Sequence, residues 1–143
     1  MKSQPTLLLV DDDPYVRRVI REMLRGMGYL IREATDGREA LELLSLSRPD
    51  VILLNLVMPK MNGFAMLDEL RVMGLIEEVP VLVVTGSLTP ARVIYQKGAR
   101  GVLRKPFRMR ALRSAVEIVA RGGSLDRRRR PLRGGCIGGW DER

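Results

Sequence analysis

The chain has 143 residues, 45% apolar and 29% charged, which suits one globular domain with a sizeable core and is too short for two ordinary domains. It contains no histidine and one cysteine, Cys136, which excludes histidine-dependent catalysis, an internal disulfide and the usual zinc sites. The net charge of +8 lies in the C-terminal part: residues 86–143 hold 15 Lys/Arg against 4 Asp/Glu, whereas residues 1–85 hold 10 against 13, and such a positive field can attract phosphates, anionic lipid or an acidic protein surface.

The N-terminus enters an apolar segment almost at once, without the long apolar stretch and small-residue cleavage site of a signal peptide. The apolar runs, such as Thr6–Val10 and Val51–Leu54, are far shorter than the ~20 residues that a membrane helix needs. We therefore expect a cytoplasmic protein with no membrane-spanning segment.

Continuous apolar runs alternate with segments of helical periodicity along the first part of the chain. Apolar runs of this kind predict strands covered on both faces, as in a parallel sheet. After the first run, apolar residues recur at helical spacing from Pro14 to Met27, with Asp13 as the N-cap and Gly28 as the stop. The other elements predicted up to residue 73 are strands at Thr6–Val10, Leu30–Ala34 and Val51–Leu54 and helices at Gly37–Leu44 and Gly63–Met73.

The second part of the chain continues this alternation. It has a predicted strand at Val81–Val84, a helix at Pro90–Lys97, a strand at Gly101–Leu103 and a helix at Arg108–Arg121. Five strands alternating with five helices imply right-handed crossovers and helices on both faces of a parallel sheet. We therefore predict an α/β fold of the doubly wound type.

The composition changes after Arg121. Gly122–Ser124, the arginine run Arg127–Arg130 and a glycine-rich stretch follow, without apolar periodicity. We predict a domain at residues 1–121 and a basic, disordered or loosely held tail at residues 122–143.

Polar residues follow four of the five predicted strands. Asp11 and Asp12 come directly after the first strand, Asn55 after the third, Thr85 after the fourth and Lys105 shortly after the fifth. Ligands of open parallel sheets bind outside the carboxyl ends of the strands, near the switch point in strand order. Two carboxylates, an amide, a hydroxyl and an ammonium group are therefore expected to converge there.

The chain resembles the receiver domain of response regulators in two-component signalling, over about residues 6–120. Four motifs in order carry this resemblance: Asp11-Asp12 after Leu-Leu-Leu-Val, the segment Asn55–Gly63, Val-Val-Thr-Gly at 83–86, and Gly98-Ala99 leading to Lys105-Pro106-Phe107. The resemblance implies a flavodoxin-like (βα)5 sandwich with strand order 2-1-3-4-5, and a signalling module that is not an enzyme.

The resemblance also implies roles for the residues at the strand ends. Asp11, Asp12 and the backbone carbonyl of Val57 would hold Mg²⁺, a cation that prefers oxygen ligands. Thr85 would donate its hydroxyl to one phosphoryl oxygen, and Lys105 would bring positive charge to another.

Asn55 departs from the family at the position of the phosphate-accepting aspartate. A neutral amide is a very poor nucleophile, so phosphorylation here should fail, and the missing negative charge should weaken Mg²⁺ binding. Three accounts are open: a naturally degenerate receiver, an engineered substitution that locks the unphosphorylated form, or a position that hydrolyses slowly to aspartate. Lys105 would then face an amide oxygen in place of a carboxylate.

Two further expectations concern the region around Lys105. The Lys105–Pro106 peptide bond would be cis, as in the family. The switch position three residues before the lysine usually carries Tyr or Phe and is Val102 here. The aromatic ring that swings inward when Thr85 engages phosphate is therefore missing, which favours the naturally degenerate receiver.

The stretch Arg92–Arg121 carries nine Lys/Arg and one acidic residue, Glu117. In this family, the surface of the fourth helix, fifth strand and fifth helix is the usual docking face for a histidine kinase, another two-component protein or a second protomer. A solvated basic face is the alternative interpretation. Nucleic-acid binding through the arginines of the tail is less favoured, because its single aromatic residue, Trp140, makes no stacking platform.

Overall fold

The sheet is built from the five apolar runs. The computed structural model describes residues 3–128, and its strands are β1 Thr6–Val10, β2 Leu30–Ala34, β3 Val51–Leu54, β4 Val81–Thr85 and β5 Gly101–Arg104. All neighbouring strands are parallel, in the order β2-β1-β3-β4-β5. This confirms the predicted doubly wound, flavodoxin-like sandwich, whose switch point lies between β1 and β3.

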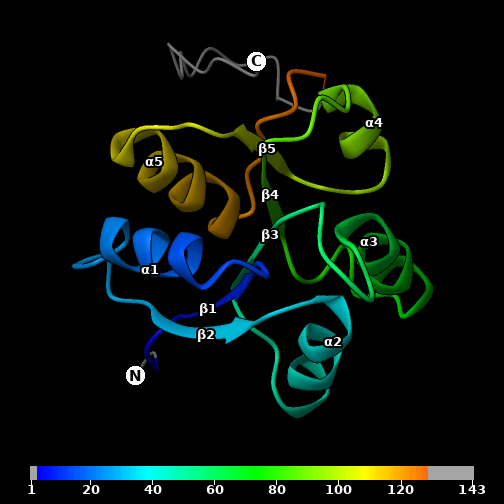
Figure 1. Cartoon of the computed structure of the whole chain (residues 1–143), viewed down its shortest axis with the longest axis horizontal. Coiled ribbons are helices and arrows are strands. Elements are labelled where there is room, and N and C mark those ends of the chain that lie inside the picture. The colour runs from blue at the N-terminus through cyan, green and yellow to red at the C-terminus, as the bar shows by residue number, and fades with distance from the viewer. Residues whose placement is uncertain (1–2, 129–143) are drawn as a thin grey trace.

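Helices cover both faces of the sheet. They are α1 Pro14–Met23, α2 Gly37–Leu46, α3 Gly63–Val72, α4 Ala91–Gln96 and α5 Met109–Ala120. Figure 1 shows α1 and α5 side by side on one face, and α2, α3 and α4 on the opposite face. This cover buries every residue of β3 and β4, as expected for central strands of a parallel sheet.

Helix α1 begins as predicted and ends earlier. Its N-cap is Asp13, whose carboxylate accepts a hydrogen bond from the backbone N–H of Tyr15 at 2.9 Å. The helix ends at Met23, and Gly26 and Gly28 follow with φ of 88° and 89°. These left-handed glycines turn the chain away from the helix axis, so the predicted continuation to Met27, with Gly28 as the stop, is wrong.

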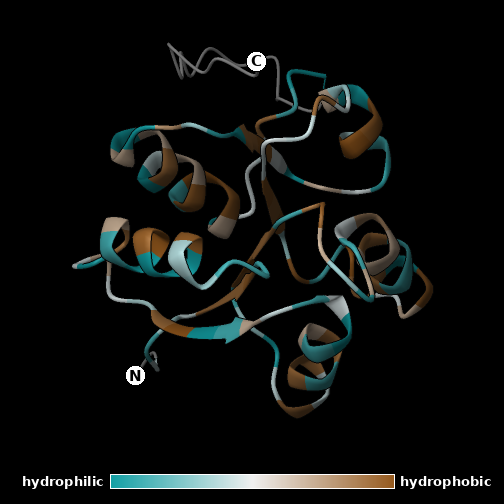
Figure 2. Cartoon of the chain, in the orientation of Figure 1, coloured by the Kyte–Doolittle hydropathy of each residue, from teal (hydrophilic) through white to brown (hydrophobic). Residues whose placement is uncertain are grey.

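Hydrophobic side chains gather between the sheet and the helices. In Figure 2 the central strands are largely brown, the hydrophobic end of the scale, and teal segments lie mostly on the outer sides of the helices. β1 is buried from Leu7 to Val10, whereas Ala34 is the one buried residue of β2. The difference follows from position, because β2 forms an edge of the sheet and has fewer neighbours to cover it.

Two residues after the predicted boundary at residue 121, Ser124 and Leu125, contact the domain. Leu125 is 2% exposed, and its backbone N–H donates to the Arg100 carbonyl at 2.7 Å. The Ser124 hydroxyl donates to the same carbonyl at 3.2 Å. Leu125 packs over Gly101, where a Cβ atom would stand 2.9 Å from the leucine Cδ1. One isolated apolar residue creates no periodicity, which is why the sequence did not reveal this contact.

The rest of the predicted tail, residues 129–143, lies outside the described residues, together with Cys136 and Trp140. Its disorder stays a prediction. Between residues 3 and 128, no helix has both the length and the apolar character needed to cross a membrane.

Candidate functional site

Asp11 follows β1 directly, and its side chain is enclosed, with 2% exposure. Its Oδ1 accepts a hydrogen bond from the backbone N–H of Asp13 at 2.9 Å, and its Oδ2 lies 3.1 Å from the Lys105 Nζ. Lys105 follows β5, at the opposite edge of the sheet from β2. Two strand ends 94 residues apart in the sequence therefore meet in one ion pair, as the parallel sheet predicted.

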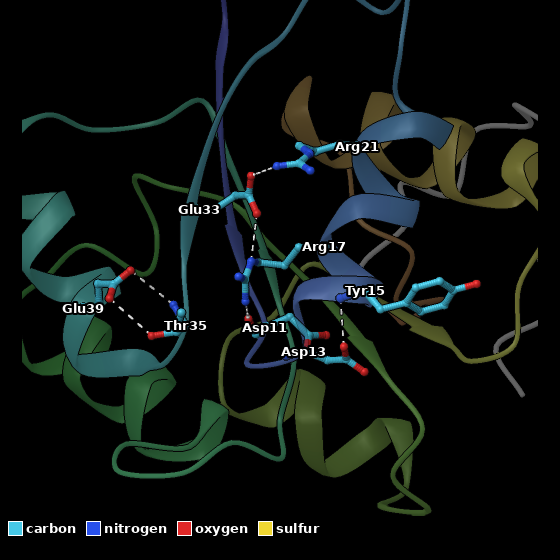
Figure 3. A network of polar contacts seen from close by, with 8 residues as sticks. All are labelled: Asp11, Asp13, Tyr15, Arg17, Arg21, Glu33, Thr35 and Glu39. Atoms are coloured by element: carbon cyan, nitrogen blue, oxygen red, sulfur yellow. Dashed lines mark hydrogen bonds and ion pairs between the residues drawn. The ribbon is translucent and has the colours of Figure 1, made fainter.

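A network of arginine and glutamate side chains braces the backbone at Asp11 (Figure 3). Arg17 of α1 donates from Nη1 to the Asp11 carbonyl oxygen at 2.5 Å, and from Nε to Glu33 of β2 at 2.8 Å. Arg21, one turn further along α1, also pairs with Glu33. Arg17 is 14% exposed, so these bonds are only partly screened by water. The network fixes the end of β1 against α1 and β2, and so holds the Asp11 carboxylate in place.

The two acidic residues after Asp11 have different surroundings. Asp12 is exposed at the rim of the site. Asp13 is engaged as the N-cap of α1. Of the predicted carboxylate pair, only Asp11 is therefore enclosed by protein.

Asn55 follows β3 directly and is 8% exposed. Its backbone N–H donates to the Val10 carbonyl at 2.9 Å, which brings it beside the end of β1. Its side-chain Nδ2 donates to the Val57 carbonyl at 2.7 Å. The carbonyl that the sequence predicted as a metal ligand is thus bonded to Asn55 itself. An aspartate at position 55 could not make this bond, because an ionised carboxylate has no donor.

Thr85 ends β4 and is fully buried, with 0% exposure. Its Oγ1 accepts a hydrogen bond from the Ser87 backbone N–H at 3.0 Å, which leaves the hydroxyl hydrogen available as a donor. The Lys105 backbone N–H donates to the Thr85 carbonyl at 2.9 Å, and the peptide bond after Lys105 is cis, as predicted. The ammonium group of Lys105 is paired with Asp11, whereas the sequence predicted the amide oxygen of Asn55 as its partner.

The two predicted valine positions differ in exposure. The Val57 side chain is 67% exposed, and only its carbonyl belongs to the site. Val102 is 3% exposed within β5, opposite Val83 of β4. This predicted switch position is therefore occupied by a core side chain.

The oxygen atoms at this edge have the chemistry that Mg²⁺ prefers, but they already have partners. Lys105 is paired with Asp11, and Asn55 donates to the Val57 carbonyl. In the part of the chain that the structure describes, no three His, Cys, Asp or Glu side chains are grouped closely enough to hold a metal ion. Two carboxylates and a carbonyl are nevertheless oxygen ligands of the kind that Mg²⁺ takes.

Gly63, the first residue of α3, packs against the backbone of Asn55. A Cβ atom on Gly63 would stand 2.5 Å from the Asn55 carbonyl oxygen and 2.7 Å from the Leu56 Cα. Because these are backbone atoms that cannot rotate away, Gly63→Ala should lower the free energy of unfolding in urea by about 1–3 kcal/mol, as overpacking does. Gly86→Ala is the control, since no atom lies within 4 Å of a Cβ there. Equal losses in the two variants would contradict the close contact.

Two arginines at the site were not identified from the sequence. Arg17 binds the Asp11 carbonyl, and Arg104 of β5 donates to the carbonyls of Ser87 and Thr89 in the loop after β4. An arginine at either position matches no motif. Its role depends on carbonyl groups that only the folded chain brings near.

The strand order, with Asp11, Thr85 and Lys105 at the carboxyl edge of the sheet, defines a CheY-like α/β domain. Residues 7–117 match the model of the response regulator receiver domain. Because the match covers more than half of the chain, the chain belongs to the response regulator receiver domain family. It is thus a receiver domain of two-component signalling.

The chain is also similar to known response regulators in sequence and in structure. Response regulator MprA of Mycolicibacterium vanbaalenii is 37% identical over 127 residues, 87% of this chain and 52% of that protein. Chemotaxis response regulator CheY4 of Vibrio cholerae gives a TM-score of 0.73 at 32% identity, over 82% of this chain and 99% of that one. The receiver domain of the Francisella response regulator 1452 gives 0.74 at 28% identity, over 82% and 98%. The chain spans about half the length of the curated relatives it matches.

Proposed function

We propose that this receiver domain is an interaction module whose contacts with partners do not depend on phosphorylation at residue 55. The observation that carries the proposal is Asn55, buried at the end of β3 beside the end of β1. We take it to occupy the position of the phosphate-accepting aspartate, because it follows the third strand and begins the motif that ends at Gly63.

The chemistry of the amide supports a receiver domain whose residue 55 is not phosphorylated, which we call a silent covalent switch. A carboxylate attacks phosphorus through a charged oxygen and forms an acyl phosphate, whereas a neutral amide is a very poor nucleophile. The Thr85 hydroxyl and the Lys105 ammonium, which would stabilise a transferred phosphoryl group, lie at the same edge of the sheet. We infer that the pocket keeps its stabilising groups and lacks its nucleophile.

Any Mg²⁺ at this pocket would be held by Asp11, Asp12 and the Val57 carbonyl, and would supply positive charge beside phosphoryl oxygens. Asn55 leaves this set one carboxylate short of a three-carboxylate pocket. Lys105 already neutralises Asp11 at 3.1 Å. We therefore infer weak Mg²⁺ binding.

Incubation of the purified chain with Mg²⁺ and acetyl phosphate tests the silent switch. We expect the intact mass to show no attached phosphoryl group, because residue 55 offers no nucleophilic oxygen. A receiver domain that carries aspartate at this position, treated in parallel, shows that the phosphodonor is active. A labile phosphoryl group assigned to residue 55 by peptide mapping would contradict the proposal.

The second hypothesis is a conventional receiver domain, switched by Mg²⁺-dependent phosphorylation, that carries a disabling substitution at residue 55. Thr85 and Lys105 favour it, since both stabilising groups are present. The same incubation with Asn55→Asp separates the two hypotheses. Robust phosphorylation of this variant would favour the disabled switch. A lack of phosphorylation would favour natural degeneration. The buried Val102 at the switch position supports natural degeneration.

As partners we propose a histidine kinase or other two-component proteins, docking on the surface of α4, β5 and α5, with a second copy of the chain as an alternative. Arg92, Arg108 and Arg110 support this choice, because all three are exposed on these elements or directly before them. A surface of this charge complements an acidic partner face.

A further inference from the structure

Arg104 links the end of β5 to the loop between β4 and α4. It is half-buried and directly precedes Lys105. Its Nη1 donates to the Ser87 carbonyl oxygen and its Nη2 to the Thr89 carbonyl oxygen, both at 2.5 Å. The planar guanidinium fork thus binds two carbonyls of one loop, a geometry that a lysine ammonium group does not reproduce.

The loop itself is hydrogen-bonded from Thr85 to Thr89. The Ser87 N–H donates to the Thr85 Oγ1 at 3.0 Å, and the Thr89 N–H donates to the Ser87 Oγ at 3.1 Å. The hydroxyl groups of Ser87 and Thr89 share a further bond at 2.8 Å. A continuous network therefore runs from the buried hydroxyl of the pocket to the residue before Pro90.

The start of α4 has little local support. The helix has only six residues, and its N-cap, Pro90, makes no side-chain capping bond. The bond from Arg104 to the Thr89 carbonyl fixes the chain one residue before this cap. Arg104 is itself held in the sheet, where it pairs with Thr85 in register. Its anchor point is therefore rigid.

We propose that Arg104 is a positioning residue that pins the β4–α4 loop and the start of α4 without any phosphoryl group in the pocket. It keeps the Thr85 hydroxyl bonded to Ser87, and it holds Leu88, which is 96% exposed, at the surface. This inference deepens the proposed function and rests on it. A receiver domain that is not phosphorylated at residue 55 needs other contacts to order this loop. Val102 offers no aromatic ring for that purpose.

Backbone hydrogen exchange of the chain, with neither Mg²⁺ nor phosphodonor, tests the proposal. Arg104→Met removes both donors, and Arg104→Lys keeps the charge without the fork. In both variants we expect the N–H groups of Ser87 and Thr89 to exchange at least about tenfold faster, since charge-assisted hydrogen bonds of this kind are lost. Exposed Arg18 of α1 provides the control, and Arg18→Met should leave these rates unchanged.

Three results would overturn the role of Arg104. The first is unchanged exchange in Arg104→Met, and the second is full protection in Arg104→Lys, which would mean that charge alone suffices. The third is an equal acceleration at the Asn55 N–H, which bonds to the Val10 carbonyl, because Arg104 would then support the whole sheet. None of these results depends on whether residue 55 accepts phosphate, so the proposed function fails or stands separately.

Discussion

Replacing Asn55 by aspartate is expected to raise the affinity of the chain for Mg²⁺ by at least about tenfold. The variant adds a carboxylate to the proposed Mg²⁺ ligands. The attraction between two opposite unit charges about 4 Å apart is about 4 kcal/mol near a protein surface, well above the ~1.4 kcal/mol of a tenfold change. It also removes the Asn55 donor from the Val57 carbonyl, which becomes available as a ligand. Isothermal titration calorimetry measures the affinity of both proteins.

Asn62→Asp is the matched control for this titration. Asn62 is the only other asparagine in the chain. It caps α3 by accepting a hydrogen bond from the Ala65 N–H at 2.9 Å, a role that aspartate also fills. The control adds the same charge outside the proposed ligand set. An equal gain in Mg²⁺ affinity in both variants would show that net charge is the cause and would contradict a site at residue 55.

Leu125→Ala is expected to lower the free energy of unfolding by about 2–4 kcal/mol, the usual cost of emptying a leucine site in a core. The side chain is 2% exposed and packs over Gly101. Urea denaturation measures the loss. Leu88→Ala, at a leucine that is 96% exposed, is the control and should stay within about 0.5 kcal/mol of the unaltered chain.

An unchanged stability in Leu125→Ala would mean that residues 122–128 are detached from the domain in solution. A loosely held tail that begins at residue 122, as predicted from the sequence, would give this result. The measurement therefore decides between that boundary and the packed segment beside β5.

The architecture was predictable because the central strands are buried on both faces. The continuous apolar runs of β3 and β4 have no solvated face, so their pattern already implies helices above and below the sheet. The end of α1 was not predictable from apolar spacing, because Gly26 and Gly28 leave the helix through backbone conformation. The packing of Leu125 was not predictable either, because a single apolar residue creates no periodic pattern.

The residues at the carboxyl edge of the sheet were also predictable, because parallel strands end at the same edge. Asp11 and Lys105 follow such strands and Thr85 ends one, and the structure brings Asp11 and Lys105 together. Their individual bonds were not predictable. The bond from Asn55 to Val57 depends on a rotamer, and the bonds of Arg104 depend on where a loop folds. Such contacts form only in the folded chain and correspond to no recognisable pattern in the sequence.

The central claim is that the pocket forms no covalent adduct, because Asn55 offers no carboxylate oxygen. Its most direct test is an amide NMR titration of the unaltered chain with beryllofluoride, a tetrahedral analogue of a phosphoryl group that bonds to carboxylate oxygen, at constant Mg²⁺. We predict that the amide resonances of Asn55, Thr85 and Lys105 stay in place throughout the titration. Saturable shifts at these three amides would contradict the claim, because an adduct would then form at residue 55 without a carboxylate.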